Sequence, residues 1–219
     1  FLGLIPNGVN APENPNWGGW GGRYIWRQPY GETHPIWTQG GDLFRRVTSA
    51  DTVNGHTSDQ ATIWRWRQAY QNDFAARMDW TVKPYKAANH QPEVTVTTSF
   101  AITPQGTQTM TLVASARDPD GNKLTYHWFP YPEAGAHEGV NLADVTVQGN
   151  GPRATVTAIS PCRKAWIDGL VPCKGSGFAH IILAVTDNGT PALTRYRRVV
   201  FEVKSKEGLA DQNPELFPK

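Results

Sequence analysis

The chain has 219 residues, of which 39% are hydrophobic and 18% charged, and its formal net charge is +2. This balance is typical of a globular protein and excludes a largely disordered chain. The basic residues are scattered, apart from Arg45-Arg46 and the run Arg195 to Arg198, whereas nucleic-acid binding needs a concentrated basic face. No apolar run approaches the ~20 residues of a membrane span, and no signal peptide opens the chain. We therefore expect neither nucleic acid nor a membrane as a partner.

The chain opens with an apolar run, Phe1 to Ile5, that ends at Pro6. Such a run predicts a buried strand, and a buried parallel strand needs neighbours on both sides. We therefore expect the protein to extend upstream of Phe1. Residues 11–57 are punctuated by Gly and Pro, and a stretch this long is usually packed over a larger body. We expect the upstream segment to supply that body.

A glycine-tryptophan run, Asn16-Trp-Gly-Gly-Trp-Gly-Gly-Arg-Tyr24, is the most distinctive local feature. Glycine permits tight turns, so Trp17 and Trp20 are expected on a loop. Exposed tryptophan rings stack on sugar faces, which makes them candidates for carbohydrate binding. The alternative is that they cap a hydrophobic core under the loop. The same two alternatives apply to four further residues: Trp26, Trp37, Trp64 and Trp66.

One helix is predicted in the first part of the chain, with Ser58 or Asp59 as its N-cap. Trp64 and Trp66 are two positions apart, so at most one of them packs inward. The residues 87–92 lack periodicity and are predicted to link a first domain, 1–86, to a second one. The apolar stripe of the helix recurs at three- and four-residue steps: Ile63, Trp66, Tyr70, Phe74 and Met78.

Residues 93–205 are predicted to form an immunoglobulin- or cadherin-like β-sandwich, followed by a loose tail, 206–219. Asp118-Pro-Asp-Gly121 is a turn sequence. Asp118, Asp120 and Asp187 could instead form a calcium site, but we favour the turn. Seven runs rich in Val, Ile, Thr and aromatic residues predict the strands: 93–98, 109–115, 123–129, 144–147, 153–159, 178–186 and 194–203.

The two cysteines, Cys162 and Cys173, bracket a short segment. A disulfide between them would close a loop and is worth roughly 3 kcal/mol in the chain-entropy model, whereas two buried free thiols are the alternative. We favour the disulfide, which predicts an oxidising compartment outside the cell. Asn188 begins a glycosylation sequon that agrees with this location, although Pro191 weakens it.

Two short motifs resemble those of nucleoside hydrolases. The stretch Leu4 to Glu13 is similar to the pattern Glu-x-Asn-x-x-x-Asp-Pro-Glu, whose Asn contacts sugar hydroxyls, and Asn7, Pro12 and Glu13 fall in matching places. Ile5 and Ala11 stand in place of its first Glu and its Asp. Asn72-Asp73 is similar to a His-Asp pair in which the Asp ligates calcium and the His lies beside the leaving group. The Asn cannot donate a proton as imidazolium does.

A broader resemblance, to the cellulose-binding, nucleoside hydrolase-like family, covers nearly the whole chain. In that family an α/β nucleoside hydrolase-like domain precedes a small C-terminal β-domain. The resemblance implies that residues 1–86 are the C-terminal portion of such an α/β domain. Its motifs here are Leu4 to Gly8, the glycine-tryptophan run, Ile63 to Arg67, Gln71 to Trp80, Asp118 to Gly121, Thr186 to Pro191 and Thr194 to Arg198.

This resemblance predicts a secreted protein that binds cellulose or a related glucan. Asn72 and Asp73 are the candidate catalytic residues, and Asp73 is also the candidate metal ligand. Calcium needs 6–8 oxygen ligands, so most would come from an upstream segment of the same protein, which is itself an expected partner. The candidate substrate-binding residues are Asn7, Glu13, Trp17, Trp20, Arg23, Trp64 and Trp66.

Two other functions stay open. The protein could be a calcium-dependent hydrolase of N- or O-glycosidic bonds whose site the upstream segment completes. It could also be a structural or adhesive extracellular module in which the tryptophans are buried. Whether the protein is an enzyme is therefore left open.

Overall fold

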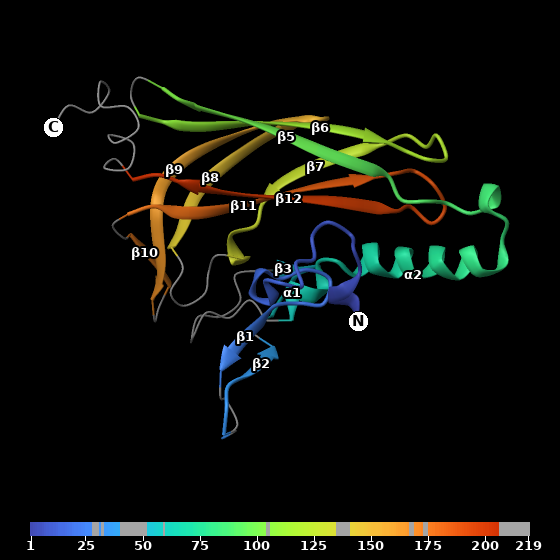
Figure 1. Ribbon diagram of the computed structural model, residues 1–219, viewed down its shortest axis with the longest axis horizontal. Coiled ribbons are helices and arrows are strands. Elements are labelled where there is room, and N and C mark those ends of the chain that lie inside the picture. Colours follow the sequence, from blue (N-terminus) through green and yellow to red (C-terminus); the bar gives the residue numbers. More distant parts are fainter. Residues whose placement is uncertain are drawn as a thin grey trace.

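The computed structural model describes residues 1–27, 31, 33–39, 52–58, 60–103, 106–134, 141–166, 169–172 and 175–205. It is mostly β-sheet with few helices (Figure 1). No helix in the described ranges is long and apolar enough to cross a membrane. Asp59, Cys173 and the predicted tail, 206–219, lie outside the described residues.

The second half of the chain forms one β-domain. Its sheet has the order β12-β11-β8-β9-β6-β5, with β7 added on β11 and β10 on β9. Neighbouring strands are antiparallel except for a single parallel pair between β8 and β11. All seven predicted strands are confirmed, and β10 is an additional one. The bounds are β5 (Glu93–Ile102), β6 (Gln108–Arg117), β7 (Thr125–Pro130), β8 (Asn141–Asn150), β9 (Arg153–Trp166), β10 (Gly169–Pro172), β11 (Gly177–Thr186) and β12 (Thr194–Val203).

The main core lies inside the β-domain, where Val94 of β5, Leu112 of β6 and Val156 of β9 pack with Trp128 of β7 and Leu183 of β11. Along β6 every second residue is buried, because successive side chains of a strand point to opposite faces. This alternation is why the strands could be predicted from local sequence.

Strand β11 is buried on both faces. Ile181, Leu183 and Val185 belong to the main core, whereas Ile182 and Ala184 face a second core shared with the N-terminal part. A strand covered on both sides has a continuous apolar run rather than an alternating one. The β-domain itself is therefore at least part of the body over which the N-terminal loops pack, which corrects the expectation that this body lies wholly upstream.

The predicted N-terminal strand is wrong. Leu2–Leu4 form a short 3-10 helix, η1, and Phe1 and Leu4 are largely exposed. The side chain of Asn7 accepts hydrogen bonds from the N–H groups of Val9 and Asn10, both at 2.9 Å. An asparagine that bonds its own following backbone favours a turn over an extended strand.

The predicted helix is present but divided into α1 (Ala61–Trp64) and α2 (Arg67–Val82). Trp66 is buried and Trp64 is partly exposed, which confirms that at most one of the pair packs inward. The stripe is wrong beyond Tyr70: Phe74 and Met78 are exposed, while the buried residues of α2 are Asp73 and Ala76. The interruption between the helices shifts the buried face, and Asp73 is accommodated because it has polar partners.

The remaining elements of the N-terminal part are short. They are η2 (Pro15–Trp17), β1 (Tyr24–Arg27), β2 (Ile36–Gln39), β3 (Thr52–Val53), β4 (His56–Thr57) and η3 (Tyr85–Ala87). β1 pairs with β2 and β3 with β4, both antiparallel. The assignment of residues 1–86 to an α/β domain stays a prediction, and so do the predicted domain boundaries.

The predicted linker, 87–92, is held against the β-domain. The Asn89 amide donates to both oxygens of Asp187, at 3.1 and 3.0 Å, and to the carbonyl of Pro191 at 2.9 Å. Burial raises the pKa of the Asp187 carboxyl, although the N–H of Leu193, which donates to it, acts in the opposite direction. The two halves of the chain are therefore joined by a buried polar network rather than by a loose connection.

Candidate functional site

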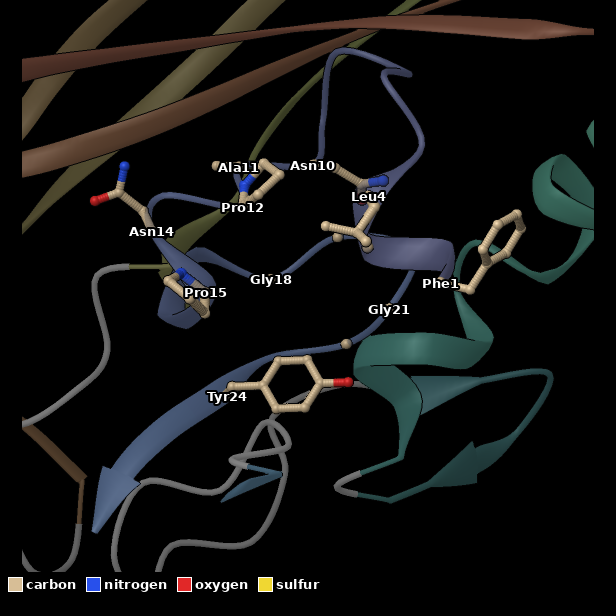
Figure 2. Close-up of a pocket in the computed structure, with 13 residues that line it drawn as sticks. Phe1, Leu4, Asn10, Ala11, Pro12, Asn14, Pro15, Gly18, Gly21 and Tyr24 are labelled. Atoms are coloured by element: carbon tan, nitrogen blue, oxygen red, sulfur yellow. The ribbon is translucent and has the colours of Figure 1, made fainter. Parts of the chain in front are cut away.

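A pocket of about 250 Å³ opens between the N-terminal loops and the start of β1 (Figure 2). Backbone of the glycine-tryptophan run forms one wall, and Pro12, Pro15 and Tyr24 contribute rings. Asn10 joins the walls, because its side-chain amide donates to the carbonyls of Leu2 and Ile5, both at 2.8 Å. Among the described residues, no side chain that lines this pocket is charged.

The hairpin β1–β2 presents exposed aromatic rings beside this pocket. Trp26 and Trp37 are directly opposite each other, with ring centroids 5.4 Å apart, and they are 58% and 48% exposed. Tyr24 precedes Trp26 by two residues on the same strand, so it lies on the same face, and it is 40% exposed. We call Tyr24, Trp26 and Trp37 the aromatic strip. Tyr24 also lines the pocket, so strip and pocket are continuous. Figure 1 shows the hairpin projecting from the rest of the molecule.

Most of the predicted tryptophans lie elsewhere. Trp20 and Trp66 are 1% and 4% exposed and both contact the ring of Tyr196. Trp17 is partly buried and lies edge-on against His180 with ring centroids 4.8 Å apart. For Trp20 and Trp66 the arrangement matches the alternative that they cap a core, and their rings are not available to a sugar in this conformation.

The other predicted substrate-binding residues are also dispersed. Asn7 is fully buried, and its backbone carbonyl accepts a hydrogen bond from the N–H of Tyr196 at 2.9 Å. Arg23 is 3% exposed, whereas Glu13 is exposed on the loop after Pro12. Trp64 is partly exposed on α1. The structure therefore does not gather these residues around one ligand.

The predicted catalytic pair faces the β-domain. Asn72 donates to the carbonyl of Ala192 at 2.8 Å. The Asp73 carboxylate accepts hydrogen bonds from Arg77, at 2.7 Å, and from the side chain of Gln91. A calcium ion at Asp73 would have to displace the Arg77 guanidinium, so the residues around Asp73 do not fit the ion in this arrangement. Among the described residues no three His, Cys, Asp or Glu side chains form a possible metal site. Calcium held with ligands from an upstream segment stays a prediction.

Three smaller predictions concern the β-domain. Asp118 Oδ1 accepts from the N–H groups of Asp120 and Asn122, at 2.9 and 3.0 Å, so the predicted turn is confirmed. Asn188 is exposed, as a glycosylation site needs to be, and glycosylation stays a prediction. Cys162 is 2% exposed, but Cys173 lies outside the described residues, so the disulfide stays a prediction.

Sequence reasoning left the aromatic strip undecided. Trp26 and Trp37 were two of several tryptophans with open alternatives, and Tyr24 was not singled out. The available signal is that Trp26 lies in the short run Tyr24-Ile-Trp-Arg27 and Trp37 in Ile36-Trp-Thr-Gln39. Two such runs separated by turn-forming residues indicate a hairpin.

Comparison with known proteins finds a family similar to the β-domain. Residues 109–203 match the family described as Cellulose-binding protein Sde0182, C-terminal domain. The predicted resemblance to this family is thereby confirmed over most of the β-domain.

A solved structure extends the similarity into the N-terminal part. It is a nucleoside hydrolase-related hypothetical protein from Saccharophagus degradans that is associated with carbohydrate metabolism. The two share 30% sequence identity with a TM-score of 0.58 over 91% of this chain and 45% of that one. This chain thus spans less than half of that protein's length. No curated protein matches the chain significantly.

Proposed function

We propose that the protein binds a neutral plant-type polysaccharide, cellulose or a related glucan, outside the cell. The observation that carries this proposal is the aromatic strip. Three exposed aromatic rings on one face of a projecting hairpin form an apolar surface, and such surfaces on soluble proteins mark binding sites. Tryptophan and tyrosine suit sugars because each combines a broad apolar face with a polar group.

The shape and charge of the site favour an extended, uncharged ligand. Tyr24 and Trp26 are two positions apart on a strand, which separates their backbones by about 7 Å, and Trp37 lies across from Trp26. The strip therefore offers stacking surfaces along a line rather than around a closed cavity. The described residues that line the adjoining pocket carry no charged side chain, so they contribute no attraction specific to an acidic sugar.

The comparisons support the same ligand class. The matched family is named for a cellulose-binding protein, and the similar solved structure is associated with carbohydrate metabolism. The proposal includes three further expectations. They are an immunoglobulin-like sandwich behind a partial nucleoside hydrolase-like domain, a Cys162–Cys173 disulfide and secretion from the cell. The hydrolase alternative gains no support from Asn72 and Asp73, since both side chains are bonded to neighbouring protein groups.

Alanine at both Trp26 and Trp37 is expected to weaken binding to insoluble cellulose by about tenfold or more, because the stacking surfaces are lost. The measurement is a pull-down binding isotherm of the full chain on microcrystalline cellulose. The matched control is Ile36→Ala, which removes an exposed apolar side chain from the opposite face of the same hairpin.

The control is expected to bind like the wild type. Equal binding by the double variant and the wild type would contradict the proposal, and so would a wild type that binds no glucan. An unchanged tryptophan fluorescence with every soluble glucan would favour the structural or adhesive alternative instead.

A further inference from the structure

Strand β12 carries charged residues at positions that face the core side of the sheet. Val199 lies opposite Ile181 in β11 and packs against the main core, as an inward position should. Arg197 lies opposite Leu183, and Arg195 lies opposite Val185. Residues directly opposite in an antiparallel pair point to the same face, so both arginines are on the core side of the sheet. Inward positions of packed sheets are normally apolar.

The two arginines line a cleft of about 600 Å³ at the edge of the β-domain. Strands β5 and β12 border it, and Figure 1 shows these two strands running next to each other. Val94 and Ala116 contribute apolar lining. At this end of the domain the main core is therefore not closed by apolar side chains, and a basic cleft replaces it. The volume lies in the range of small-molecule sites.

The guanidinium groups retain unused donors. Arg195 donates from Nη1 to Gln91 Oε1 at 3.1 Å, and Arg197 donates from Nη1 to its neighbouring backbone carbonyl, that of Tyr196, at 3.1 Å. A guanidinium has five N–H donors, so most donors of both groups lack a protein acceptor among the described residues. Neither arginine has a guanidinium nitrogen that is both buried and without a hydrogen-bond partner. The free donors are therefore open to the cleft.

Within the described part of the chain, the charge in the cleft is not balanced by nearby carboxylates. Glu93 is the acidic residue among the described lining residues, and it pairs with Arg117 at 2.7 Å. Asp73 lies behind Gln91 and pairs with Arg77. Burial and the like charge of Arg197 lower the pKa of Arg195, against the opposing effect of Asp73. Arg195 and Arg197 have no carboxylate partner among the described residues, so an anion that enters the cleft would stabilise both cations.

We propose that this basic cleft, defined by Arg195 and Arg197, is a binding site for an oxyanion. Guanidinium groups bind planar carboxylates and tetrahedral oxyanions through paired N–H donors, and such charge-assisted bonds are the strong ones. A uronate carboxylate on an acidic sugar and a free phosphate or sulfate share this chemistry. The size of the cleft accommodates a sugar ring together with its carboxylate. The site is independent of the aromatic strip, which lies on a different hairpin.

Calorimetric titration of the full chain at low salt tests the proposal. The probes are a galacturonate trimer, its methyl ester, inorganic phosphate and sulfate. The galacturonate trimer is expected to bind about tenfold or more tightly than the uncharged methyl ester, with an affinity that falls as salt is added. Binding of phosphate or sulfate without preference for the trimer would also support an oxyanion site and would assign it to a small free ion.

Matched variants locate the binding. Arg197→Gln is expected to fold, because it loses one hydrogen bond to a backbone carbonyl, and to weaken oxyanion binding about tenfold. Lys204→Gln removes a positive charge that lies outside the cleft lining and that Glu202 pairs at 3.1 Å, and it is expected to leave binding within about twofold. The proposal is overturned if no oxyanion probe binds the wild type, or if Arg197→Gln binds as tightly as the wild type. These probes do not need the aromatic strip, so a failure on cellulose leaves this test unaffected.

Discussion

Replacing Gly8 with alanine is expected to undock the N-terminal part from the β-domain, at a cost of about 4 kcal/mol in the free energy of unfolding. Gly8 has φ +92°, a backbone conformation that residues with a side chain rarely adopt, and a Cβ there would overlap the backbone carbonyl oxygen of Tyr196. The N–H of Tyr196 donates to the carbonyl of Asn7, so the two backbones cannot separate without losing that bond.

The measurement is chemical denaturation, with limited proteolysis to detect release of the N-terminal segment. The matched control is Gly121→Ala. Gly121 has φ +79°, but nothing lies within 4 Å of its Cβ position. It therefore carries only the backbone strain, about 1–2 kcal/mol. Equal losses for Gly8→Ala and Gly121→Ala would show that the close approach to β12 is unimportant.

The β-domain could be predicted because its signals are local. Its strands alternate buried and exposed residues, and turns such as Asp118 to Gly121 separate them. Even β11 could be located from its continuous run of apolar residues. What covers its second face could not be predicted, since that contact joins residues such as Val9 and Ile182, which are far apart in sequence.

The candidate site shows the same limit. The glycine run places Trp17 and Trp20 on a loop but leaves open whether their rings are exposed or buried, and Trp20 is buried against Tyr70 and Tyr196. Local flexibility indicates a loop but not which surface the loop covers. Trp26 and Trp37 are exposed because their hairpin projects from the body, and that also depends on tertiary arrangement.

Charged side chains were the hardest to place. Asp73 matched a metal-ligand motif, but its carboxylate is bonded to Arg77 and Gln91. The sequence marks the run from Arg195 to Arg198 as a basic cluster and as part of a family motif, but it does not show which face each arginine occupies. On a strand its members point alternately to two faces, so Arg195 and Arg197 face the cleft while Arg198 faces the N-terminal part. Arg195 and Arg197 thus line the cleft, whereas Arg198 of the same run holds the N-terminal part.

Arg198→Leu is expected to lower the free energy of unfolding by about 3–5 kcal/mol. The Arg198 guanidinium donates to the backbone carbonyls of Val9 at 2.7 Å, Gly18 at 2.9 Å and Trp17 at 3.3 Å. Its carbon also lies 5.3 Å from the centre of the Tyr131 ring. Burial lowers the pKa of Arg198 to about 10, so the guanidinium stays charged at neutral pH. Its hydrogen bonds therefore remain charge-assisted.

Leucine fills part of the space but leaves these carbonyls without their donor, which costs more than the loss of an exposed bond. Arg198→Lys keeps the charge without the forked geometry and is expected to lose an intermediate amount. Arg197→Leu, one position away on the opposite face, is the matched control and is expected to change stability by less than about 1 kcal/mol. Urea denaturation of the three variants checks the order. If Arg198→Leu were as stable as Arg197→Leu, the N-terminal part would be held by its apolar contacts alone.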